Sequence, residues 1–132
     1  MAGRRYNQHK RGVGRFVQLP EWVQATEAWA TLPPGPRALY IELKRRFNGT
    51  NNGKITLSHR EAAKALGVSR NTPGKWFKLL EQRGFIFETQ GHCLGPSGVG
   101  ETAHWGLSEE ATPDGKPARK TFTKFKSPAQ IS

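Results

Sequence analysis

Side chains that can hydrogen-bond to nucleic acid are concentrated between residues 69 and 78. Three of them are basic residues, Arg70, Lys75 and Lys78. Such side chains donate hydrogen bonds to the O6 and N7 acceptors of guanine. Asn71 carries an amide, the group that pairs with the N6 and N7 edge of adenine. This set of donors and acceptors predicts contact with the edges of base pairs rather than a catalytic step.

One helix must present these side chains together. Trp76, Phe77 and Leu80 recur at helical spacing and predict a buried stripe. Pro73 suits a first turn, because proline has no N–H to lose there. When this stripe faces inward, the residues that face outward near the start of the helix are Arg70, Asn71, Gly74, Lys75 and Lys78. A helix N-terminus also attracts phosphate, so the same surface suits the DNA backbone.

An earlier helix is expected to pack against this one. Ser58 and Glu61 have the spacing of a capping box, which predicts a helix start at Ser58. Gly67 follows at the position where glycine takes a left-handed backbone without strain. The next helix starts near Ser69 and ends at Gly84. Two short helices joined by a glycine and a small turn are typical of a helix-turn-helix.

The run from residue 58 to residue 86 resembles the winged helix-turn-helix of GntR-type bacterial repressors. A Ser-x-x-Glu-Ala-Ala helix, a Gly-Val-Ser turn and a Leu-Glu-x-x-Gly-Phe-Ile exit recur there, and this chain has all three. The run is also similar to the first domain of DnaD-like and phage replisome-organiser proteins. A wider match, from Phe16 to about Leu107, resembles small bacterial, phage and plasmid helix-turn-helix proteins. These resemblances imply a winged-helix fold and DNA binding.

The predicted DNA-binding residues form three groups. The first lies at the helix starts near Ser58 and Ser69, the second is the basic cluster of Arg45 and Arg46, and the third lies at the N-terminal end of the chain. An ordinary helical hairpin that binds nothing is the alternative for the first group. For the basic cluster, the alternative is interaction with the helix dipole and solvent. The residues are Ser58, His59, Arg60, Ser69, Arg70, Asn71, Thr72, Gly74, Lys75, Lys78, Arg45, Arg46, Arg4, Arg5 and Arg11.

The remaining pattern predicts an α+β fold, mainly α with a small antiparallel sheet. We expect a helix over residues 20–32, with Trp22 and Trp29 in the core. A second helix should begin at Pro36 and end at about Phe47, because Leu39, Tyr40 and Leu43 fall at helical spacing.

Three short strands complete the expected winged helix. They should span residues 54–57, 85–89 and 102–107, and a glycine-rich loop over 91–101 should join the last two. This loop departs from the usual wing, because it contains no Lys or Arg. Contact between the wing and DNA is therefore an open question.

The net charge of +11 lies mostly at the two ends of the chain. Residues 1–15 contain five bases and no acid, and residues 111–132 contain five bases and one acid. We expect a disordered basic arm over 1–15, a winged helix-turn-helix domain over 16–110, and a basic flexible tail over 111–132. Such ends favour polyanions, nucleic acid above all, although solubility alone is the simpler explanation.

Other chemistry finds little support. His92, Cys93 and His104 lack the spacing of a zinc site, and neither a phosphate-binding glycine loop nor paired carboxylates stand out. We expect no metal, no cofactor, no catalytic residue and no enzymatic activity. One cysteine indicates a reducing compartment, and the longest apolar run is far below the ~18 residues of a membrane span. We therefore expect a cytoplasmic, nucleoid-associated protein without membrane contact.

The sequence predicts a protein that binds double-stranded DNA and reads the major groove with a recognition helix. The expected role is that of a bacterial, phage or plasmid transcription regulator. Two alternatives remain open: a DNA replication initiator or replisome organiser, and a winged-helix protein-interaction module. Duplex DNA is the expected partner. A homodimer is left open, because one recognition helix reads few bases, and so is a replication or transcription protein as a further partner.

Overall fold

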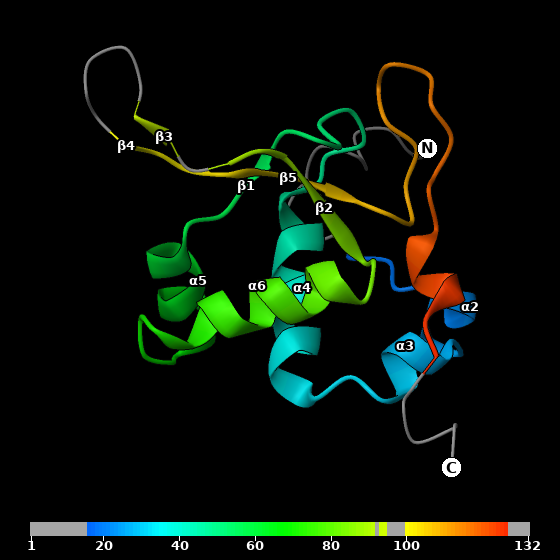
Figure 1. Ribbon diagram of the computed structural model, residues 1–132, viewed down its shortest axis with the longest axis horizontal. Helices are drawn as coiled ribbons and strands as arrows, with labels where there is room; N and C mark the ends of the chain where they lie inside the picture. The colour runs from blue at the N-terminus through cyan, green and yellow to red at the C-terminus, as the bar shows by residue number, and fades with distance from the viewer. Residues whose placement is uncertain (1–15, 92, 95–99, 127–132) are drawn as a thin grey trace, which may run out of the picture.

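The computed structural model describes residues 16–91, 93–94 and 100–126. This part of the chain combines helices with a small antiparallel sheet (Figure 1), so the expected α+β class is confirmed. The elements are α2 (Glu21–Gln24), α3 (Glu27–Ala30), α4 (Pro34–Arg46), β1 (Ile55–Thr56), α5 (His59–Leu66), α6 (Thr72–Gln82), β2 (Ile86–Gln90), β3 (Cys93–Leu94), β4 (Gly100–Glu101), β5 (His104–Leu107) and the 3-10 helix η1 (Thr121–Lys124).

The three-stranded sheet has the order β1–β5–β2, with both pairs antiparallel. Ile55 lies opposite Trp105, and Ile86 lies opposite Leu107. The pairing of β2 with β5 shifts register between Glu88 and Gln90. Beyond this irregularity, β3 and β4 form a separate two-stranded hairpin within the expected loop, and Figure 1 shows it projecting away from the helices.

Two short helices replace the single helix expected over 20–32. Thr26 interrupts it, because its backbone is extended and its hydroxyl accepts a hydrogen bond from the Trp29 N–H as the N-cap of α3. Trp29 is buried, as expected. Trp22 is 44% exposed and stacks on Phe122, with 5.6 Å between the ring centroids. Its expected place inside the core is therefore wrong.

The long helix α4 begins at Pro34 rather than at the expected Pro36, with Pro33 as its N-cap. Proline fits these positions, since the first N–H groups of a helix have no partner within the helix. Leu39 and Leu43 are buried on the inner face of α4, as expected.

Trp76 is only half-buried, so the expected buried stripe on α6 is correct for Phe77 and Leu80 but not for Trp76. The indole of Trp76 lies against the first turn of α4. A Cβ atom on Gly35 would stand 2.3 Å from Trp76 Cζ2. Trp76 therefore packs at the edge of the contact between α6 and α4.

This contact predicts an unusual response to Gly35→Ala. In most helices the change stabilises by about 0.5–1 kcal/mol. Here the added methyl group overlaps the indole, so we expect the free energy of unfolding to fall by about 1–3 kcal/mol. Urea denaturation measures it. In a Trp76→Ala background, where the space is open, the same change should be neutral or stabilising. A gain in stability in the parent background would contradict the packing described here.

The C-terminal segment (residues 111–126) completes the core instead of forming the expected flexible tail. Phe122, in η1, is fully buried and stacks on Phe85 with 4.8 Å between ring centroids. The Lys120 N–H donates to the Ser108 carbonyl at 2.8 Å, and Phe125 lies under the Arg83 guanidinium. The expected domain end at residue 110 is therefore wrong, since the core requires a side chain beyond it.

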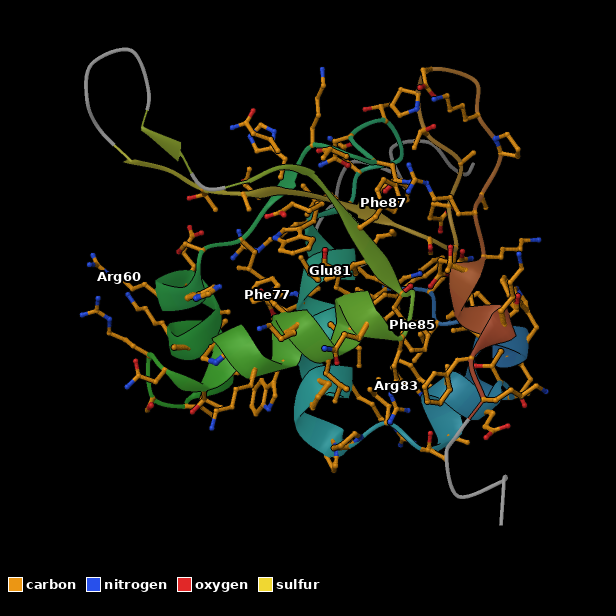
Figure 2. The ribbon with its side chains drawn as sticks, viewed as in Figure 1. Arg60, Phe77, Glu81, Arg83, Phe85 and Phe87 are labelled. Atoms are coloured by element: carbon orange, nitrogen blue, oxygen red, sulfur yellow. The ribbon has the colours of Figure 1, made fainter. Side chains whose placement is uncertain are left out.

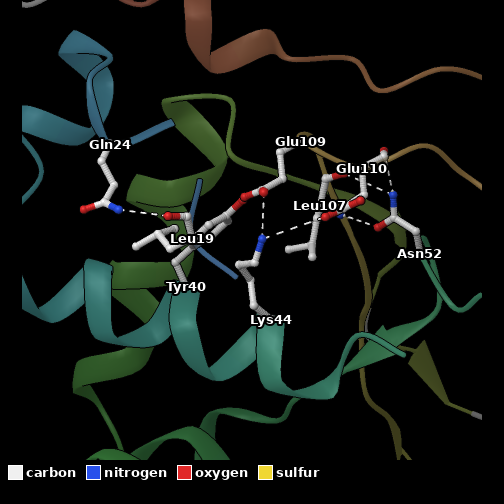
Figure 3. A network of polar contacts seen from close by, with 8 residues as sticks. All are labelled: Leu19, Gln24, Tyr40, Lys44, Asn52, Leu107, Glu109 and Glu110. Atoms are coloured by element: carbon white, nitrogen blue, oxygen red, sulfur yellow. Dashed lines mark hydrogen bonds and ion pairs between the residues drawn. The ribbon is translucent and has the colours of Figure 1, made fainter. Parts of the chain in front are cut away.

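A buried polar network joins α4 to the chain that follows β5 (Figure 3). Lys44 Nζ lies 2.7 Å from Glu109 Oε2, and the two side chains are 4% and 1% exposed. The Tyr40 hydroxyl donates a hydrogen bond to the same carboxylate. Burial, reinforced by the charge of Glu109, raises the pKa of Tyr40 well above its usual range, so the phenol remains a donor. Glu110 extends the network at 3.9 Å from Lys44.

Asn52 anchors the turn after α4 to the end of β5 (Figure 3). Its amide nitrogen donates to the carbonyls of Leu107, Glu110 and Ala111 at 3.0–3.1 Å, and its amide oxygen accepts from the Leu107 N–H at 2.6 Å. The turn over residues 48–53 therefore includes a side chain with a tertiary role. No helix in the described part of the chain is long and apolar enough to cross a membrane.

Candidate nucleic-acid interface

The capping box expected at the start of α5 is present. Ser58 Oγ accepts from the Glu61 N–H, and the Glu61 carboxylate accepts from the Ser58 N–H, both at 3.0 Å. The second of these bonds holds the pKa of Glu61 below its ordinary value. Gly67 ends α5 with φ of 69°, in the left-handed region. Ser58 is thus committed to its own helix, which makes it a positioning residue rather than a free DNA contact.

The next helix begins at Thr72, later than the expected start near Ser69. Ser69 instead forms the turn: its carbonyl accepts from the Thr72 N–H at 3.0 Å and its hydroxyl accepts from the Asn71 N–H at 3.3 Å. Asn71 occupies the N-cap position, yet its side chain makes no capping hydrogen bond. Arg70 and Asn71 are exposed, so both lie in the turn before α6, with their side chains in solvent.

The contact between α5 and α6 uses two of the predicted DNA-binding residues. The His59 ring stacks on Phe77, with 5.1 Å between the centroids. Gly74 faces this ring, because a Cβ atom on it would lie 3.4 Å from His59 Cε1. The expectation that Gly74 points outward is therefore wrong. Phe77 stacks in turn on Trp105 of β5, so the start of α6 is fixed to both α5 and the sheet.

Exposed bases surround the junction of α5 and α6. Lys75 and Lys78 are exposed on α6, as predicted, and Arg60 is exposed on α5. Figure 2 shows Arg60 at the end of the molecule farthest from α2 and α3. Lys64 is also exposed and was not among the predicted residues. Its spacing of four from Arg60 on one helix was the signal, since residues i and i+4 share a face.

Between residues 58 and 78 the chain carries five bases and one acid. The acid, Glu61, is engaged by the capping box. No salt bridge is formed by Arg60, Lys64, Arg70, Lys75 or Lys78 within the described residues. This surface, here termed the basic face, thus combines uncompensated positive charge with the exposed amide of Asn71.

The arginines at the end of α4 already have a partner. Arg45 Nη1 lies 3.1 Å from Glu42 Oε1, and Arg46 Nη2 lies 3.7 Å from Glu42 Oε2. Both arginine side chains remain partly exposed, but binding a phosphate would compete with Glu42. They are weaker candidates than the basic face. The predicted contacts Arg4, Arg5 and Arg11 lie outside the described residues.

The β3–β4 hairpin adds no positive charge, since the sequence between Gly91 and Glu101 contains no Lys or Arg.

Within the part of the chain that the structure describes, no three His, Cys, Asp or Glu side chains are grouped to hold a metal ion. Comparisons with protein-family models, with curated proteins and with solved structures give no match.

Proposed function

We propose that the protein is a winged helix-turn-helix protein that binds duplex DNA, with the start of α6 in the major groove. The order of elements supports this proposal: a helix (α4), a strand (β1), two helices (α5, α6), and two strands (β2, β5) flanking a projecting hairpin. In a helix-turn-helix, the second helix places its N-terminal residues against base edges while the first crosses the backbone.

The observation that carries the proposal is the basic face. Lys75 and Arg70 donate to guanine-type acceptors, and Asn71 suits adenine. Arg60 and Lys64, on α5, lie where the first helix of such a motif meets phosphates. Phe77 and Leu80 hold α6 in the core, which keeps this arrangement rigid. The resemblance of residues 58–86 to GntR-type repressors favours transcription regulation as the cellular role.

The test starts with duplexes selected from a random pool by the full chain, so that specific and random DNA can be compared. Arg70→Ala and Lys75→Ala should each weaken binding to the selected site by about 1–3 kcal/mol. The effect on random DNA should be smaller. Lys124→Ala is the matched control, because Lys124 is an exposed base on η1, and its effect should be slight.

Two results would argue against this assignment. Equal losses on selected and random DNA would make Arg70 and Lys75 phosphate contacts without base recognition. Unchanged binding in both variants, with thermal stability also unchanged, would place the DNA on another surface. The salt dependence adds an independent measure: each lost phosphate contact should reduce the slope of log affinity against log salt by about 0.9.

A further inference from the structure

A cavity of about 780 Å³ lies away from the basic face, between the turn that follows α4 and the C-terminal segment. One wall comes from residues 50–54 and the other from residues 112–119, and Phe87 and Thr89 of β2 lie between them. Figure 1 shows both loops on the far side of the sheet from α5. The volume falls within the ~300–1,000 Å³ of sites that bind small molecules.

The aromatic surface of this cavity is Phe87. Its ring lies over Gly106, the residue opposite it in β5, where a Cβ atom would stand 2.3 Å from Phe87 Cζ. Glycine at this position lets the ring lie flat on the sheet. The Arg119 guanidinium lies over the ring, 3.7 Å from its centroid. One face of the Phe87 ring therefore rests on Gly106 and the other is covered by the guanidinium, so a flat ligand ring would contact the edge of Phe87 and the outer plane of Arg119. Guanidinium planes are surfaces on which flat rings stack.

Three bases and one acid line the cavity: Lys54, Lys116, Arg119 and Asp114. Asp114 accepts hydrogen bonds from the Thr112 hydroxyl and from the Lys116 N–H, so it serves the loop itself. The Lys116 ammonium lies 3.9 Å from Asp114. Within the described residues, Lys54 and Arg119 form no ion pair. Two cationic groups are thus free to receive an anion beside the aromatic plane.

We propose that this cavity binds a small aromatic anion: a flat ring beside Phe87 and Arg119, with a phosphate or carboxylate on Lys54 and Arg119. A nucleoside monophosphate and an aromatic carboxylate both have this chemistry. The walls are hydrophobic enough to bury a ring, since Phe87, Pro113, Pro117 and Ala118 contribute to them. This binding site is separate from the basic face and does not depend on DNA binding.

The experiment titrates the full chain with four probes and follows backbone amide signals by NMR. Adenosine monophosphate and benzoate each carry a ring and an anion. Adenosine and inorganic phosphate each lack one of the two. At least one of the first pair should shift the signals of residues 50–54, 87–89 and 112–119, with an affinity at least about tenfold above the second pair. The tighter binder of this first pair shows whether the site prefers a phosphate or a carboxylate on the ring.

Two variants test the named residues. Arg119→Gln should weaken binding of the better probe by at least about tenfold, because it removes a charge-assisted contact and the guanidinium plane on which the ligand ring stacks. Lys54→Gln removes an exposed ammonium without a partner in the described structure, so its folding should be unaffected, and it should weaken binding several-fold. Lys124→Gln is the control and should bind like the parent. Thermal melting establishes that each variant is folded.

Four outcomes would overturn the proposal. The first is the absence of cavity shifts with both ring-containing anions. The second is phosphate binding as tightly as the better of the two ring-containing anions, which would reduce the site to a nonspecific cluster of charge. The third is unchanged affinity in folded Arg119→Gln and Lys54→Gln. Shifts confined to residues 59–78 would also overturn it, and would instead report binding of the nucleotide to the basic face.

Discussion

Phe122→Ala is expected to lower the free energy of unfolding by about 3–5 kcal/mol, a large part of the stability of a small domain. The Phe122 ring is fully buried and lies against Phe85 and Trp22. Gly84 approaches its backbone so closely that a Cβ atom there would be 2.9 Å from the Phe122 nitrogen. Because the surroundings are held this tightly, the vacated space should collapse only partly. Urea denaturation followed by tryptophan fluorescence measures the loss.

Lys124→Ala provides the control, since Lys124 lies in the same 3-10 helix but is exposed. Its effect should stay within about 0.5 kcal/mol. If Phe122→Ala unfolded at the same urea concentration as the parent, the C-terminal segment would lie off the core in solution. The domain would then end near residue 110, as the sequence pattern predicts.

Removing one member of the buried Lys44–Glu109 pair should destabilise the protein about as much as Phe122→Ala does. Lys44→Met and Glu109→Gln should each lower the free energy of unfolding by about 3–5 kcal/mol, because each leaves the other group uncompensated inside the protein. The double variant should lose clearly less than the sum of the two, since it leaves neither charge alone. A double-mutant cycle in urea measures the coupling between the two side chains.

The chain contains its own control for this cycle. Lys116 and Asp114 also form an ion pair, at 3.9 Å, but their side chains are 75% and 60% exposed. Lys116→Met and Asp114→Asn should each change stability by less than about 1 kcal/mol. Similar small effects at Lys44 and Glu109 would show that water reaches the buried pair, contrary to the burial described here.

Local features of the fold could be predicted from the sequence because their causes are local. The capping box joins residues that are three apart in sequence, and the left-handed backbone at the end of α5 favours glycine at position 67. The inward faces of α4 and α6 follow from apolar spacing within each helix. These features also determine most of the candidate site, because Arg70, Asn71 and Lys75 are positioned by the turn and by the burial of Phe77.

The predictions that the structure contradicts concern contacts between separate parts of the chain. Phe122 sits among lysines and threonines, and prolines precede it, a composition typical of a flexible tail. Its partners, Trp22 and Phe85, are far away in sequence, so no periodicity reveals them. Helical geometry alone predicts an outward Gly74, whereas the His59 ring that it faces belongs to another helix. Spacing defines the face of a helix but not the neighbour that covers it.

The stacking of Trp22 on Phe122 also has a kinetic consequence. Closing a long loop costs entropy before its contact contributes any stability, so contacts between distant residues tend to form late in folding. His59 and Phe77, which join α5 to α6, are 18 residues apart in sequence, whereas Trp22 and Phe122 are 100 residues apart. The segment should therefore join after the transition state and be the first part to open in the native protein, so that Phe122 acts mainly on the rate of unfolding.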